Sequence, residues 1–274
     1  LSAPQAGARA VYTPHGGSLH YSWNSLSGAL FLSLERVLMG RTDGLIFVSD
    51  HARRSYEEKI GVPTCPVRVI HNGLHAAEFE PVPRGSESYD FAFVGEMRTL
   101  KGIDVLIDAV KELTDRRDVS VLLVGSGPDE ERIRARVREL GLSRSVAMSP
   151  AIRPARAAFE MARCVVIPSL AESLPYIVLE VLAAQVPLLV TGVGGIPEIF
   201  GPHASGLLPP GDAPALTRAM LDFLDDPDRA SERASLIREQ LKGHVRVSQM
   251  VDATLELYGA TAESVAPVRT ATRR

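Results

Sequence analysis

Hydrophobic and polar positions follow two alternating periodicities along most of the chain. Short runs of β-branched and other apolar residues are typical of strands buried in a parallel sheet. They lie at 9–13, 44–48, 67–70, 90–94, 119–124, 146–148, 164–167 and 187–190. Between and after them, apolar residues recur at helical spacing. These predicted helices are 28–39, 50–60, 103–113, 129–140, 154–161, 175–182, 213–224, 229–241 and 245–258. Strands that alternate with helices predict an α/β fold with doubly wound parallel sheets.

A linker is predicted to divide the chain. Residues 78–88 contain three acids, two prolines and a glycine and lack apolar periodicity. Residues 89–241 hold five predicted strands with their helices, enough for a complete open sheet, whereas 1–77 holds three, which predicts a partial one. We expect 242–259 to form a helix that packs back on the amino-terminal part, and 260–274 to be disordered.

The charge of the chain indicates which classes of binding partner to expect. Thirty Lys and Arg against thirty-three Asp and Glu give a net charge of −3, spread evenly, so bulk electrostatics predict no nucleic-acid partner. An anion would have to be held by a local site. Basic residues in 132–163 and at the carboxyl end leave peripheral contact with an anionic membrane open, although a solvated helix face explains them more simply.

The cysteines, the apolar stretches and the first residues of the chain indicate the cellular compartment of the protein. Cys65 and Cys164 show no Cys-x2-Cys or Cys/His spacing, which predicts neither a zinc site nor a disulfide framework. The most apolar stretches are interrupted by charges such as Glu35 and Glu172, so no spanning helix is predicted. The chain begins with Leu1 and shows no basic-then-apolar leader. These features favour a cytoplasmic protein, or a fragment of one.

The loop after the predicted strand 90–94 is a candidate phosphate site, because ligands of open α/β sheets bind beyond the carboxyl ends of strands. Residues 95–102 carry a glycine at each end and two cations, Arg98 and Lys101. Backbone amides and cations together can hold a phosphate. For this segment alone, a solvated loop that precedes a helix is the simpler interpretation.

The loop after 119–124 is a tight turn into a helix. It contains Gly125, Ser126 and Gly127, but Glu130 stands where a dinucleotide fingerprint needs its third glycine. A dinucleotide site is therefore weakly indicated, and ordinary helix-start chemistry explains the turn equally well.

The segment after 164–167 holds the richest chemistry. Ser173, two residues before a proline, suits the start of a helix, which would leave Glu172 in the loop and Glu180 about two turns along the helix. The helix would direct free N–H groups and its positive dipole end at the sheet edge, where an anion such as pyrophosphate binds well. The two carboxylates could accept hydrogen bonds from sugar hydroxyls. Ordinary surface charge is the alternative for either acid.

A glycine-rich loop follows the last predicted strand, 187–190. Residues 191–198 include Gly194 and Gly195 and open a short helix. Glycines permit positive φ and a close approach of backbone to a ligand. A plain loop is nearly as good an interpretation of this segment alone.

Taken together and in this order, these loops resemble the carboxy-terminal half of the family 4 retaining glycosyltransferases, which have the GT-B fold. The resemblance spans about 10–258. Its most specific element is the Glu-x7-Glu pattern of Glu172 and Glu180, followed by the loop 194–198. Further matching motifs are Asn72-Gly73 and segments 93–95, 101–104 and 123–128. The resemblance implies a complete Rossmann-like nucleotide-sugar domain at 89–241 and a partial, acceptor-side one at 1–77.

The resemblance also implies roles for the acids. Glu180 would hold the ribose hydroxyls of a sugar nucleotide. Glu172, with the backbone of Ser173 and Leu174 after it, would face the donor sugar.

Other roles follow from the same family pattern. Arg98 and Lys101 would neutralise the diphosphate, Ile152 would lie near the base, and His15 would face the donor from the amino-terminal domain. Nucleotide contacts are also implied for Gly125, Ser126, Gly127, Gly194 and Gly195. Three positions depart from the pattern: Glu96 and Gln185 stand where the family more often has arginine and glycine, and His75 falls near an expected aspartate.

The function implied is hexosyl-type transfer from a nucleoside-diphosphate sugar to a hydroxyl of a polysaccharide, glycolipid or similar acceptor, with retention. No cofactor or metal is expected, because the only acidic cluster, 225–228, follows a helix instead of a strand. Two alternatives stay open: a non-catalytic or truncated nucleotide-binding module that needs further strands or a partner, and, less favoured, a nucleotide-sugar epimerase. A homo-oligomer and contact with the inner face of the membrane are also left open.

Overall fold

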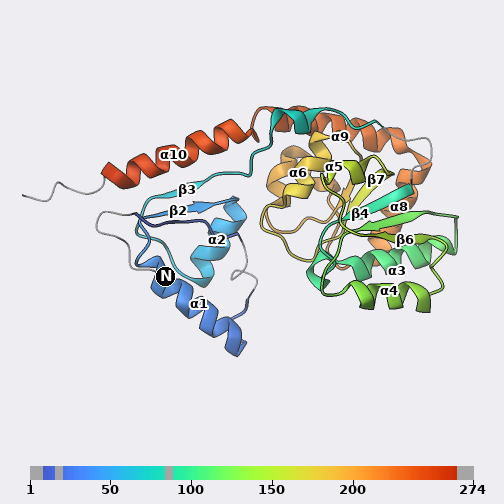
Figure 1. Ribbon diagram of the computed structural model, residues 1–274, viewed down its shortest axis with the longest axis horizontal. Coiled ribbons are helices and arrows are strands. Elements are labelled where there is room, and N and C mark those ends of the chain that lie inside the picture. The colour runs from blue at the N-terminus through green and yellow to red at the C-terminus, as the bar shows by residue number, and fades with distance from the viewer. Residues whose placement is uncertain (1–8, 16–20, 84–88, 264–274) are drawn as a thin grey trace, which may run out of the picture. The chain divides into compact units, whose positions relative to one another are not determined.

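The computed structural model describes residues 9–15, 21–83 and 89–263, with side chains as far as 260 (Figure 1). The chain divides into two compact units, Leu1–Gly73 with Val247–Arg274, and Leu74–Arg246. Each is described by itself. Within the described residues, no helix combines the length and the apolar character that crossing a bilayer requires.

The first unit contains a small parallel sheet with the order β1-β2-β3. Its strands are Val11–Tyr12, Gly44–Phe47 and Val67–Val69, and its helices are α1 (Leu26–Met39), α2 (Asp50–Lys59) and α10 (Val247–Glu263). Ile46 on β2 packs with Ile70 and Leu257, the last from α10. Phe47, the next residue along β2, makes an edge contact with Tyr56 of α2 at 5.2 Å between ring centres. Successive residues of the strand therefore contact helices on opposite faces of the sheet.

The second unit contains a five-stranded parallel sheet with the order β6-β5-β4-β7-β8. Its strands are β4 (Tyr89–Val94), β5 (Val121–Val124), β6 (Val146–Ser149), β7 (Ala162–Ile167) and β8 (Leu188–Val190). Its helices are α3 (Ile103–Thr114), α4 (Glu130–Glu139), α5 (Arg156–Phe159), α6 (Tyr176–Ala183), α7 (Ile196–Phe200), α8 (Ala213–Asp225) and α9 (Pro227–Lys242). Its short 3-10 helices are η2 (Ala76–Phe79), η3 (Thr99–Lys101) and η4 (Gly201–Gly206). The predicted doubly wound α/β fold is confirmed.

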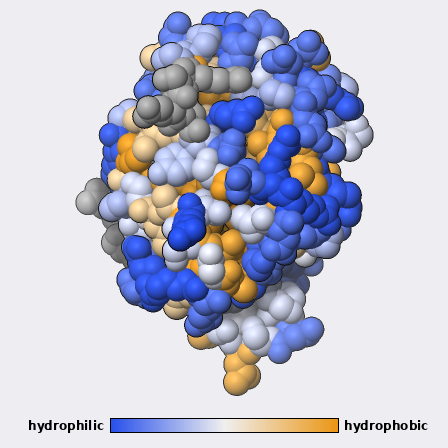
Figure 2. Space-filling view, turned by 90° about the vertical axis from the view of Figure 1, so that its right-hand side faces the viewer, coloured by the Kyte–Doolittle hydropathy of each residue, from blue (hydrophilic) through white to orange (hydrophobic). Residues whose placement is uncertain are grey.

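Helices cover both faces of this sheet. Figure 1 shows α3 and α4 on one face and α5 and α6 on the other. Phe91, Phe93 and Leu123 belong to an apolar core that they form with residues of α3, α4 and α8. Figure 2, which shows the molecule from the right-hand side of Figure 1, shows hydrophobic surface in patches between hydrophilic side chains. Burial on both faces explains the continuous apolar runs that predicted the strands.

The predicted linker 78–88 is different in the structure. Residues 76–79 form η2, and Phe79 and Val82 are buried in the second unit. The Val82 amide donates to the Ala184 carbonyl at 3.0 Å, and Arg238 donates to the Phe79 carbonyl. The polar composition concealed two apolar anchors spaced three residues apart. Residues 84–88 lie outside the described part of the chain.

The carboxyl-terminal segments also differ in their bounds. Residues up to Arg246 belong to the second unit, because the Leu74 amide donates to the Val245 carbonyl at 2.7 Å. Helix α10 continues to Glu263, beyond the predicted end at 258. The tail predicted to be disordered therefore begins inside a helix, and its remainder, 264–274, lies outside the described residues.

Candidate functional site

A cavity of about 640 Å³ opens at the carboxyl ends of the strands of the second unit. Its walls come from the loops that follow β4, β5, β6 and β7 and from the start of α6. The charged, serine and glycine residues of the lining are Gly95, Glu96, Lys101, Gly125, Ser126, Arg153 and Glu172, and the remainder is largely apolar. This is the edge at which open α/β sheets bind ligands.

An ion pair lies in this cavity. The Lys101 ammonium is 2.7 Å from Glu172 Oε1, and the side chains are 25% and 9% exposed. The same carboxylate oxygen accepts a hydrogen bond of 2.7 Å from the Ser169 hydroxyl. Thr191, after β8, donates in turn to the Ser169 carbonyl at 2.6 Å. Residues from three strand ends thus hold one carboxylate and one ammonium in a fixed place.

Two glycines bring the loops together. Gly125 has φ +148°, and a Cβ there would lie 1.8 Å from the Gly95 carbonyl oxygen. Gly194 has φ +61°, and a Cβ there would lie 1.9 Å from the Glu172 carbonyl oxygen. A side chain at either position would separate neighbouring loops. Gly194 therefore supports the site from behind, although it does not line the cavity.

The N-cap of helix α6 lies two residues later than the serine that the sequence favoured for the helix start. Pro175, in an extended conformation, is its N-cap, and Tyr176 is its first residue. Ser173 does not start the helix because its carbonyl accepts a bond of 2.7 Å from the Gly195 amide, which keeps it in the loop. Pro175, Tyr176 and Ile177 line the cavity, so the positive end of the helix dipole still lies at its wall.

The structure brings some predicted site residues to the cavity and leaves others outside its lining. Those at the wall are Lys101, Glu172, Gly125, Ser126 and Ile152. Those outside the lining are Arg98, Glu180, Ser173, Leu174, Gly127, Gly194 and Gly195. The Arg98 guanidinium is half exposed and lies 3.4 Å from Glu96. His15 belongs to the first unit.

Among the lining residues that sequence reasoning missed, Arg153 and Tyr176 carry polar groups. Arg153 directly follows the predicted Ile152, so its place after a strand was the available signal. Tyr176 is the first residue of α6, a position that the misplaced helix start concealed. Among the residues that the structure describes, no group of three or more His, Cys, Asp or Glu side chains could hold a metal ion.

Glu180 lies on α6 in a partly buried position. Burial, and secondarily the charge of Glu78, raise its pKa above the ordinary value. The folded state therefore binds this proton more tightly than the unfolded state, so stability falls as pH rises from the ordinary pKa through the raised one. The ionised carboxylate is then a source of instability at neutral pH.

We expect Glu180→Gln to raise the melting temperature at pH 7, because the amide carries no charge that burial and Glu78 disfavour. The difference from wild type should shrink toward pH 4, which melting curves across this range will show. Glu239→Gln is the control of opposite sign: Lys242 lowers the pKa of Glu239, so its ionised form is favoured. A destabilised Glu180→Gln variant at pH 7 would contradict the expectation.

Family models match both parts of the chain. The model described as glycosyl transferases group 1 matches residues 76–242, which contain the whole cavity, and the model described as glycosyltransferase family 4 matches residues 1–78. A D-inositol 3-phosphate glycosyltransferase of Corynebacterium jeikeium is 31% identical over 215 residues, covering 69% of this chain and 51% of the relative. The chain thus spans about half the length of the curated relatives it matches.

Solved structures agree on the fold. Sucrose-phosphate synthase from Thermosynechococcus elongatus superposes with a TM-score of 0.80 at 24% identity, over 93% of this chain and 68% of that one. Anabaena HepE in complex with UDP-glucose gives a TM-score of 0.79 at 18% identity, over 92% and 72%. The predicted GT-B architecture is confirmed. The chain belongs to the glycosyl transferases group 1 family.

Proposed function

We propose that this chain binds a nucleoside-diphosphate sugar in the cavity of its second unit and that the protein transfers the sugar to an acceptor hydroxyl with retention at the anomeric carbon. The observation that carries the proposal is the Lys101–Glu172 pair at the carboxyl edge of the sheet, beside the start of α6. A carbohydrate or lipid-linked hydroxyl is the acceptor class we propose.

The cavity has the chemistry that such a donor requires. Lys101 and Arg153 supply positive charge, the start of α6 supplies a dipole, and Glu172 supplies an acceptor for sugar hydroxyls. Ile152 and Tyr176 offer apolar surface for a base. Anabaena HepE was crystallised in complex with UDP-glucose, which supports a uridine nucleotide as the first donor to test.

Charge stabilisation is the main catalytic contribution that these residues can make. When the bond from the anomeric carbon to the diphosphate breaks, negative charge grows on the diphosphate oxygens. The acceptor oxygen forms the new bond to that carbon, and its hydroxyl proton passes to the departing diphosphate. A cation at about 4 Å in a medium of effective dielectric near 20 contributes about 4 kcal/mol. Lys101, already fixed by Glu172, needs little reorganisation to supply it.

Melting curves with a panel of nucleotides test the binding half of the proposal. The preferred nucleoside diphosphate, among UDP, GDP and ADP with their sugars, is expected to raise the melting temperature by about 5–10 °C at about 100 times its Kd. The matching nucleoside, which lacks the diphosphate, should give a much smaller shift. A chain whose melting temperature responds to no nucleotide would contradict the proposal.

Product analysis tests the transfer half. The anomeric configuration of the product, read by NMR, should equal that of the donor, and an inverted product would contradict retention. Nucleotide binding without sugar transfer or donor hydrolysis would instead favour the non-catalytic module. We keep this alternative because the chain spans about half the length of its curated relatives.

A further inference from the structure

Lys101 is the last residue of a single helical turn that two backbone hydrogen bonds stabilise. The Lys101 amide donates to the Arg98 carbonyl at 2.9 Å, and the Gly102 amide donates to the Thr99 carbonyl at 3.0 Å. Thr99 and Lys101 are the first and last residues of this turn, η3. Any rotation of Thr99 therefore changes the direction in which the Lys101 side chain leaves the backbone.

The turn is bonded to the loop that follows β5. The Met97 amide donates to the Ser126 carbonyl at 3.0 Å, and the Asp129 amide returns a bond of 3.0 Å to the Met97 carbonyl. Besides these backbone bonds, a side-chain contact joins this loop to η3 itself: the Thr99 hydroxyl donates to Asp129 Oδ2 at 2.7 Å. Thr99 is thereby attached to the residue that precedes α4.

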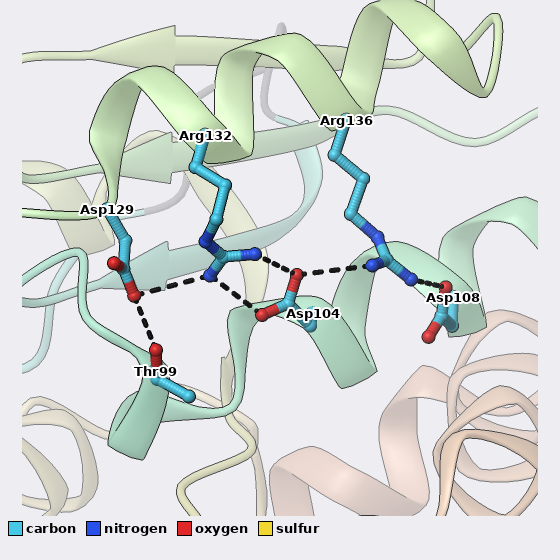
Figure 3. Close-up of polar contacts among 6 residues, drawn as sticks. All are labelled: Thr99, Asp104, Asp108, Asp129, Arg132 and Arg136. Carbon is cyan, nitrogen blue, oxygen red and sulfur yellow. Dashed lines mark hydrogen bonds and ion pairs between the residues drawn. The ribbon is translucent and has the colours of Figure 1, made fainter.

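Asp129 is held from the other side by α4 (Figure 3). Arg132 donates to the same oxygen, Asp129 Oδ2, at 3.2 Å, and it clamps both oxygens of Asp104 on α3 at 2.8 and 2.9 Å. Arg136 continues the row, with 2.6 Å to Asp108. The Thr99 hydrogen bond and the neighbouring Arg132 lower the pKa of Asp129, so it accepts as a carboxylate at neutral pH. The network thus fixes the acceptor that Thr99 meets.

We propose that Thr99 and Asp129 are positioning residues for Lys101: their hydrogen bond orients η3 so that the Lys101 ammonium is presented to the diphosphate of the donor. The proposal rests on the proposed function for its ligand, and on the described contacts for its geometry. Neither residue lines the cavity, so both would act only through Lys101.

A contribution to overall stability explains this contact less well. Thr99 is exposed, and the Arg132 and Asp129 side chains are 47% and 22% exposed. Exposed ion pairs contribute little to folding. Misplacement of a reacting group, in contrast, lowers function steeply. A hydroxyl-to-carboxylate bond beside the ammonium-bearing turn is therefore expected to matter for the ligand more than for the fold.

A double-mutant cycle on the full chain tests the coupling, with calorimetric titration of UDP or whichever diphosphate the panel selects. Thr99→Val, which removes the hydroxyl at constant size, should weaken binding about three- to tenfold. In a Lys101→Ala background it should have no further effect. Thr99→Ser should restore wild-type affinity. Thr114→Val is the matched control, because that hydroxyl donates to the Lys111 carbonyl at the far end of α3.

A second readout does not depend on the nucleotide. The rate at which an amine-acylating reagent labels Lys101, read by mass spectrometry against Lys111, should rise several-fold in Thr99→Val and Asp129→Ala, because a displaced ammonium loses Glu172. Unchanged labelling, or an equal loss of UDP affinity in the Lys101→Ala background, would overturn the positioning role. If the wild-type chain binds no nucleotide, the proposed function fails. The labelling rates still decide whether Thr99 and Asp129 position Lys101.

Discussion

Replacement of Lys101 by alanine is expected to lower turnover about 100-fold or more, the loss typical of removing one charge-stabilising donor from a reacting centre. The Lys101 ammonium lies in the cavity, 2.7 Å from the Glu172 carboxylate, which holds it in place. The substitution also leaves the Glu172 carboxylate without its ion-pair partner in a site where it is 9% exposed. Initial rates of sugar transfer or donor hydrolysis measure the effect.

Lys111→Ala is the matched control for that variant. Lys111 makes an ion pair of the same length, 2.7 Å, with Asp115, but on the surface of α3, so its loss should leave turnover close to wild type. Near-normal turnover in Lys101→Ala would remove this residue from the site. Equal losses in both variants would show that general charge, and not the place of Lys101, is responsible.

Gly102→Ala is expected to destabilise the second unit by about 3–5 kcal/mol, through backbone strain together with a steric clash. Gly102 is buried and has φ +68°, and a Cβ there would lie 1.9 Å from the Pro168 carbonyl oxygen. The neighbouring Leu100 carbonyl accepts a bond of 2.8 Å from the Leu170 amide, so the two backbones cannot separate cheaply. Urea unfolding followed by circular dichroism measures the loss.

Gly141→Ala separates the two causes. Gly141 has φ +71°, almost the same backbone conformation, but nothing lies within 4 Å of the Cβ position. Its substitution should therefore cost only the backbone strain, about 1–2 kcal/mol. A Gly102→Ala variant no less stable than Gly141→Ala would mean that the contact between the loops after β4 and β7 yields easily.

Local chemistry also explains where sequence reasoning about the elements succeeded and where it missed. The buried strands and amphipathic helices were predictable because each is recorded in its own periodicity. The start of α6 was not, because the Ser173 carbonyl is used by Gly195, a residue twenty-two positions away. Gln185, which stands where the family more often has glycine, illustrates the same division. Its φ of +60° is the left-handed conformation that glycine adopts most readily, and its side chain donates to the Ser235 hydroxyl.

The sequence by itself determined the α/β alternation, the family resemblance and the residue types at the strand ends, since these depend on neighbours within one loop or one helix turn. Only the tertiary structure decided which of those residues meet. Lys101 and Glu172 are seventy-one residues apart and touch, whereas Arg98, three residues from Lys101, pairs with Glu96 and does not itself line the cavity. The reason is physical: contact across a parallel sheet depends on strand order and loop closure, which no local pattern records.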